Sequence, residues 1–180
     1  DPALAATYAC SGITCYSAVS KALPLEPGKP ALIIGAGGIG LMMIAMLKAF
    51  GHDRIVTVDI DPAKRDAALA AGASQAIDGN GDDVAARVLA ACGPVAAAFD
   101  CVNRDSTARA ALDCLGKGGK LVLVGVAGGE LTLSLATMIF RALAVIGNNT
   151  GSPADLRAVL ALANAGKLAP TPVTCCLHAS

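Results

Sequence analysis

A glycine-rich stretch that follows an apolar run has the residue types and spacing needed to hold a phosphate. Residues 31–34 are uniformly apolar, and Gly35, Gly37 and Gly40 follow in the pattern G-x-G-x-x-G. The first glycine permits a tight turn, the second lets the backbone approach a pyrophosphate, and the third lets a helix pack closely on a sheet. Free N–H groups and the helix dipole would then bind the anion. The predicted phosphate-binding residues are Gly35, Gly37, Gly38, Ile39 and Gly40.

A carboxylate lies about twenty residues beyond this turn, at the end of the next apolar run. Asp59 can accept hydrogen bonds from both hydroxyls of an adenosine ribose, and its charge would repel a 2′-phosphate. This combination predicts binding of NAD in preference to NADP. Alternatively, Asp59 caps the turn before Pro62, although Asp61 is better placed for that task.

Strand and helix signals alternate from residue 30 onward, and these elements must position the glycine turn and Asp59. Such alternation predicts an α/β fold, a Rossmann-type, doubly wound six-stranded parallel sheet with helices on both faces. Its ligand crevice lies outside the carboxyl ends of the strands. The expected strands are 31–34, 54–58, 75–77, 95–99, 120–124 and 143–146, and the expected helices are 39–50, 62–71, 82–91, 106–115 and 153–165.

Composition excludes several classes of partner. Fourteen basic and fourteen acidic side chains cancel, and aromatic residues make up only 3%, which argues against a nucleic-acid partner. The uncharged segment 30–47 has the length of a membrane helix, but its glycines favour a buried strand followed by a buried helix. Seven cysteines, an odd number without a Cys-x-x-Cys pair, predict a reduced cytoplasmic protein with mostly buried thiols.

The 54% share of apolar residues is high and has two explanations. It indicates surface meant for another domain or subunit, or an alanine-rich coding bias. Both chain ends look like cuts, so the sequence predicts a piece of a longer protein. We expect a lead-in helix at 1–29, a dinucleotide-binding domain at 30–170, and at 171–180 the start of a return to a catalytic domain.

The segment upstream of the turn points to a family. Cys10, Gly12, Thr14 and Tyr16 form a Cys-x-Gly-x-Thr-x-Tyr pattern. Here the chain resembles medium-chain dehydrogenases/reductases of the zinc-dependent alcohol dehydrogenase type, and the resemblance covers nearly the whole chain. It extends over 35–40, 58–61 with Lys64, 118–122, 124–126 and 147–152.

The resemblance implies roles for individual residues. Cys10 matches the third ligand of a catalytic zinc whose other Cys and His ligands would lie upstream, since His52 and His178 are isolated and expected at the surface or at helix ends. Thr14 matches a residue near the nicotinamide, and Lys64 one that reaches the adenosine ribose. Val102 would line the adenine–ribose side, and Val124, Gly125 and Val126 would flank the nicotinamide. Each residue also has a plainer interpretation. Lys64 would be a solvated charge on a helix, Cys10 a buried thiol, and the valines ordinary packing residues at strand ends.

The implied activity is hydride transfer between NAD and a small alcohol, aldehyde or ketone, with zinc binding the substrate oxygen in the intact protein. The chain by itself is then expected to be inactive. The resemblance also implies a homodimer, or a dimer-based tetramer, paired through 143–146. The alternatives are a zinc-free quinone reductase-like relative, a nucleotide-sensing module and a methyltransferase. Asp100 is expected to be structural or a minor cofactor contact.

Overall fold

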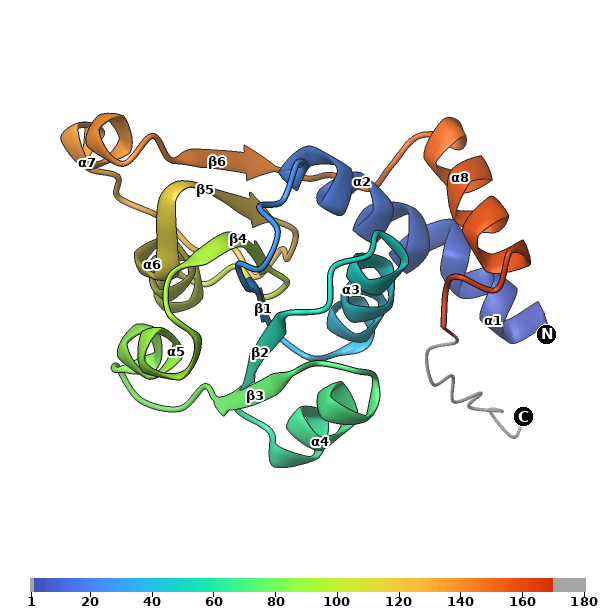
Figure 1. Cartoon of the computed structure of the whole chain (residues 1–180), viewed down its shortest axis with the longest axis horizontal. Coiled ribbons are helices and arrows are strands. Elements are labelled where there is room, and N and C mark those ends of the chain that lie inside the picture. Colours follow the sequence, from blue (N-terminus) through green and yellow to red (C-terminus); the bar gives the residue numbers. More distant parts are fainter. Residues whose placement is uncertain (1, 170–180) are drawn as a thin grey trace.

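A six-stranded, all-parallel sheet forms the centre of the molecule. The computed structural model describes residues 2–169. The strand order is β3-β2-β1-β4-β5-β6, so the predicted doubly wound Rossmann arrangement is confirmed (Figure 1). The strands are β1 Ala31–Ile34, β2 Ile55–Asp59, β3 Gln75–Asp78, β4 Val95–Asp100, β5 Leu115–Leu123 and β6 Ala144–Gly147.

The central strands are apolar because both of their faces are covered. Ala31 and Ile33 of β1 pack into the core on one face, and Leu32 and Ile34 pack into the core on the other. Ile34 is in register with Val58 of β2 and with the last residue of β4, so three carboxyl ends meet at one edge. Successive strands are added toward one edge of the sheet from β1 to β3 and toward the other edge from β4 to β6. The switch lies between β1 and β4, and in folds of this type the ligand crevice lies there.

Two helical layers cover the sheet (Figure 1). One core joins the sheet to α2 (Ile13–Ala22), α3, α4 and α8, and the other joins it to α5 and α6. Asp61 caps α4 through a hydrogen bond accepted from the N–H of Ala63, as the sequence indicated. The helices are α3 Gly38–Ala49, α4 Pro62–Ala70, α5 Val84–Cys92, α6 Asp105–Cys114, α7 Leu135–Phe140 and α8 Pro153–Asn164.

The N-terminal helical segment is tied to the far end of the sheet. It consists of α1 Pro2–Thr7, a π-helical turn η1 Tyr8–Gly12 and α2 Ile13–Ala22. Asn148, just after β6, donates to the carbonyl of Thr14, and Lys21 donates to the side chain of Asn148. These contacts place the lead-in helix against the sheet domain; the proposed boundaries of the domains stay predictions, and 170–180 lie outside the described residues.

Three sequence-based expectations need correction. β5 begins at Leu115 rather than Lys120, because the pairing with β4 skips from Val95↔Leu115 to Ala97↔Lys120 and leaves an irregular stretch between them. α7 was not expected; it occupies the connection between β5 and β6. His52 follows the end of α3, which is one of its two predicted locations, but it is buried rather than exposed, with no hydrogen-bond partner for its Nε2 among the described residues.

The thiols of the described residues are less buried than the sequence predicted, and Cys175 and Cys176 lie outside those residues. Cys15 and Cys114 are buried, Cys92 and Cys101 are half-buried, and Cys10 is exposed. No helix within residues 2–169 combines the length and apolar character needed to cross a bilayer.

Candidate functional site

The turn between β1 and α3 has geometry that its glycines make possible. Gly35 has φ of +93°, and a Cβ there would lie 2.8 Å from Cγ2 of Val102. A Cβ on Gly40 would lie 2.0 Å from the carbonyl oxygen of Gly35, so only glycine lets α3 begin this close to the strand. The functions assigned to these two glycines therefore match their surroundings.

Gly37 differs from Gly35 and Gly40 because a Cβ there would contact no other atom. It precedes α3 with φ of −75°, and no heavy atom lies within 4 Å of a Cβ built on it. The first N–H groups of α3 have no intrahelical partners, as at any helix start. The space above Gly37 is therefore open beside unpaired donors, which fits an approaching phosphate.

Asp59 closes the site on its other side. The residue is only 9% exposed, and its Oδ2 accepts a hydrogen bond of 2.7 Å from the N–H of Ala36 in the glycine turn. Its Oδ1 accepts one of 2.9 Å from the N–H of Asp61. A carboxylate has about four lone-pair sites, so each oxygen can still accept from a ligand hydroxyl. Asp59 thus both tethers the turn and presents a carboxylate beside it.

Three adjoining hollows follow the carboxyl ends of β1, β2 and β4. The turn hollow, of about 270 Å³, is lined by Gly35, Gly37, Gly38, Ile39, Gly40, Asp59, Lys64, Cys101 and Val102. The second hollow, which we call the strand-end hollow, has a volume of about 290 Å³ and adjoins the turn hollow. The two hollows share Gly35, Asp59, Lys64 and Val102, and the strand-end hollow is also lined by Ile60, Arg104 and Thr107, among others. Eight predicted cofactor-binding residues thus gather around one cleft.

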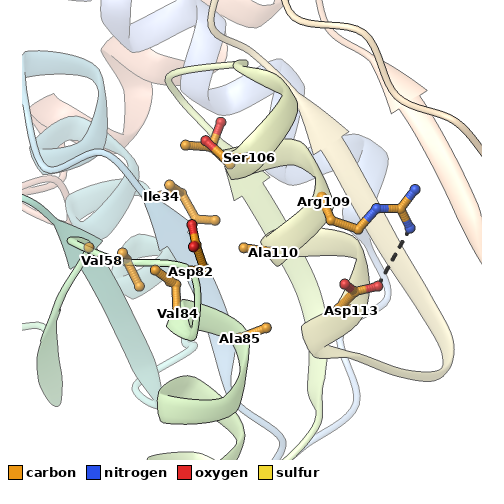
Figure 2. A pocket seen from close by; sticks show the side chains of 12 residues that line it. Ile34, Val58, Asp82, Val84, Ala85, Ser106, Arg109, Ala110 and Asp113 are labelled. Atoms are coloured by element: carbon orange, nitrogen blue, oxygen red, sulfur yellow. Dashed lines mark ion pairs between the residues drawn. The ribbon is translucent and has the colours of Figure 1, made fainter.

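The third hollow lies between α5 and α6 and encloses about 280 Å³. Figure 2 shows Ile34 and Val58 entering it from the strand ends, and Val84, Ala85 and Ala110 from the helices. We call it the interhelix hollow; it shares Ile34, Val58, Gly79, Ser106 and Thr107 with the strand-end hollow. Sequence reasoning missed these residues. The apolar residues Ile34 and Val58 at the strand ends could have indicated an apolar ligand pocket, but packing in the core explains apolar residues there equally well.

The loop after β4 is organised by Asp100. This carboxylate is fully buried and accepts hydrogen bonds from the N–H groups of Val102 and Asn103 and from the Thr107 hydroxyl. Burial raises the pKa of Asp100, while these three donors oppose the shift. Asp100 is therefore a structural residue here, and it holds Val102 at the wall of the cleft.

The residues after β5 sit at the same edge without lining the three hollows. The side chain of Asn103 donates a 2.9 Å hydrogen bond to the carbonyl of Gly125, and a Cβ on Gly125 would lie 2.5 Å from the backbone of Val102. Val124 packs into the core, whereas Val126 is 96% exposed. The predicted nicotinamide roles of Val124, Gly125 and Val126 stay predictions.

Cys10 and Thr14 lie on the N-terminal helical segment rather than in the hollows. The Thr14 hydroxyl donates a hydrogen bond of 2.8 Å to the carbonyl of Cys10 in the π-helical turn. The neighbouring Cys15 thiol donates a hydrogen bond to the carbonyl of Ile39 at the start of α3. Burial raises the pKa of Cys15, and that of Cys101 to about 12, so both thiols are protonated at neutral pH.

The order of the sheet, the glycine turn and the carboxylate at the end of β2 together define a Rossmann-type nucleotide-binding domain. The model of the family described as zinc-binding dehydrogenase matches residues 38–165, and the chain belongs to that family.

Individual relatives support this assignment. The chain is 34% identical over 169 residues to the NAD-dependent alcohol dehydrogenase of Saccharolobus solfataricus, a match that covers 92% of this chain and 48% of that protein. The solved alcohol dehydrogenase of Aeropyrum pernix superposes with a TM-score of 0.83 at 32% identity, covering 91% of this chain and 48% of that one. The solved alcohol dehydrogenase of Thermus sp. ATN1 superposes with a TM-score of 0.86 at 26% identity, covering 95% of this chain and 50% of that one. The chain therefore spans about half the length of these relatives.

The family description raises the question of a metal centre. Within residues 2–169, no three Cys, His, Asp or Glu side chains are grouped so that they could hold a metal ion. Cys10 is exposed on the π-helical turn, and one thiolate does not make a zinc site. The described residues do not fit a zinc ion by themselves, and Cys10 as a ligand stays a prediction for a longer protein.

Proposed function

We propose that this chain is the NAD-binding part of an alcohol dehydrogenase-type oxidoreductase. The observation that carries the proposal is the tether between Asp59 and Ala36, which joins an acidic strand end to the open glycine turn. Bound NAD would accept hydride from an alcohol or, as NADH, return it to an aldehyde or ketone. The identity of the S. solfataricus relative as an NAD-dependent enzyme supports the same choice of cofactor.

The residues of the cleft divide the work of holding the dinucleotide. The N–H groups at the start of α3 would bind the pyrophosphate above Gly37, where the space is open. Asp59 would accept hydrogen bonds from the adenosine ribose, and the exposed Lys64 would reach the same sugar. The strand-end and interhelix hollows, apolar at their base, would take the adenine ring.

A thermal-shift comparison tests the proposal. NAD should raise the unfolding temperature of the chain more than NADP or S-adenosylmethionine at equal concentration, since a ligand stabilises the state that it binds. A larger shift with S-adenosylmethionine would indicate a methyltransferase instead. Equal shifts with NAD and NADP would contradict the role assigned to Asp59.

Replacement of Asp59 tests the cofactor preference directly. Asp59→Ser removes the charge that repels a 2′-phosphate and a charged hydrogen-bond acceptor, so NAD affinity should fall about tenfold or more. The ratio of NAD to NADP affinity, measured by calorimetry, should fall with it. An unchanged ratio would rule out the assignment, and the unfolding temperature without ligand reports any damage to the turn.

We also propose that the partner is a second copy of the chain, paired through the β6 edge. β6 is an edge strand that pairs with β5, and the adjoining α7 exposes Leu135, Ile139 and Phe140. Unpaired strand edges and apolar patches favour association. Analytical ultracentrifugation should find a dimer, and Phe140→Glu should shift it toward monomer. A monomeric chain at high concentration would contradict this proposal without affecting NAD binding.

A further inference from the structure

We propose that Arg65 and Asn80 are positioning residues that set the affinity for the adenosine half of the dinucleotide. Neither side chain lines the three hollows. Both instead hold the backbone that forms the walls. The inference rests on the proposed function, and its test below separates the two.

Arg65 binds the carbonyl groups at the end of β2 from behind the cleft. Its Nη1 donates to the carbonyl of Asp59 at 2.9 Å and to that of Ile60 at 3.1 Å. The same nitrogen lies 3.2 Å from Oδ1 of Asp78, at the end of β3. One guanidinium on α4 therefore joins the ends of two strands and orients Asp59 and Ile60, which both line the strand-end hollow.

Asn80 completes this connection from the other side. Its Nδ2 donates to Oδ1 of Asp78 at 2.7 Å and to the carbonyl of Ile60 at 3.2 Å. Its backbone N–H also donates to Oδ1 of Asp78. The N–H groups of Asn80, and more weakly the charge of Arg65, hold the pKa of Asp78 below its usual value, so the carboxylate stays ionised at neutral pH.

These bonds connect two walls of the cleft. Gly79 donates to the carbonyl of Asp59, the same carbonyl that Arg65 binds. Gly79 lines both the strand-end and the interhelix hollows, and Gly81 and Asp82 continue the wall of the latter. Arg65 and Asn80 thus fix the distance between the Asp59 turn and the loop 79–82, which is the width available to an adenosine.

The geometry predicts an effect restricted to ligands that contain adenosine. In Arg65→Met and Asn80→Ala, the walls lose their common anchor while every lining side chain remains. Affinity for NAD, ADP-ribose and AMP should each fall by the same factor, about tenfold for the loss of two or three hydrogen bonds. Nicotinamide mononucleotide, which lacks adenosine, should bind as it does to the original chain.

The experiment is an NMR titration of the full chain with these four ligands, together with unfolding curves. Arg157→Met, on the exposed side of α8, is the matched control and should change none of the affinities. Arg65→Lys keeps the charge but replaces the planar guanidinium by an ammonium on a different, more flexible stem, and should recover part of the loss.

Each outcome decides between the alternatives. A lower unfolding temperature with unchanged nucleotide affinities would overturn the positioning role. Equal weakening of nicotinamide mononucleotide and AMP would also overturn it, because the damage would then be general. If Arg65→Met does not fold, Asn80→Ala carries the same test. If the original chain binds none of the four ligands, the proposed function itself is refuted.

Discussion

Two regions of this molecule carry residues that suggested chemistry, and they differ in how complete they are. The glycine turn with Asp59 is assembled within this chain, since Asp59 accepts a hydrogen bond from the N–H of Ala36 and the N–H of Leu41 in α3 donates to the carbonyl of Gly37. The π-helical turn with Cys10 presents one exposed thiol. A phosphate site built from backbone N–H groups needs only a local stretch of chain, whereas a metal site needs side chains gathered from several places.

The largest expected effect concerns the glycines of the assembled region. Gly40→Ala places a methyl group 2.0 Å from the carbonyl oxygen of Gly35, which the fold cannot accommodate without moving α3. We expect a loss of about 3 kcal/mol or more in the free energy of unfolding, measured with urea. A loss below about 1 kcal/mol would show that the turn is more adaptable than its geometry indicates.

Gly37→Ala is the matched variant that separates binding from folding. A Cβ at Gly37 enters open space at an ordinary φ of −75°, so the free energy of unfolding should stay within about 0.5 kcal/mol. The same methyl group would occupy the place of the phosphate, and NAD affinity should fall about tenfold or more. Retained affinity, measured by calorimetry, would place the pyrophosphate elsewhere.

Two cysteines of the N-terminal helical segment, Cys10 on the π-helical turn and Cys15 on α2, sharpen the comparison. Cys15→Ala removes a fully buried thiol that contacts the start of α3 and should cost about 1–2 kcal/mol in urea unfolding. Cys10→Ala changes an exposed position and should stay within about 0.5 kcal/mol, with NAD affinity unchanged. Weaker NAD binding in Cys10→Ala would show that the two regions cooperate even within this chain.

The smallest effect is a dependence of stability on pH through His52, remote from both regions. Burial lowers the pKa of His52 below its usual 6.5, so the unfolded chain takes up a proton that the folded chain resists. Stability should therefore be unaffected by this residue above pH 6.5 and should decline as the pH falls toward the lowered pKa.

His52→Gln provides the control for that prediction. The variant should lose this part of the pH dependence in urea titrations and keep the remainder, to which the carboxylates contribute. The raised pKa of Asp100 acts in the opposite direction at more acidic pH, where its contribution to stability falls as the pH rises. An identical slope between pH 5 and 6.5 in both proteins would show that His52 is solvated rather than buried.

Where prediction from sequence succeeded, the signal was local. The apolar run before Gly35 and the acid at Asp59 identified β1, β2 and the turn between sheet and helix, because backbone sterics and burial act over a few residues. It failed at α7, which has only one turn and a half of helix and few buried contacts, and at β5, whose start depends on the irregular pairing with β4.

The amino-acid sequence by itself determined the class of fold and the position of the glycine turn between β1 and α3, since glycine spacing and strand–helix alternation are properties of short segments. Only the tertiary structure showed that Asp59 bonds back to Ala36, that the interhelix hollow continues the cleft, and that Arg65 and Asn80 stand behind its walls. These contacts join residues brought together by the order of the strands, and the periodicity of any one segment does not contain that order.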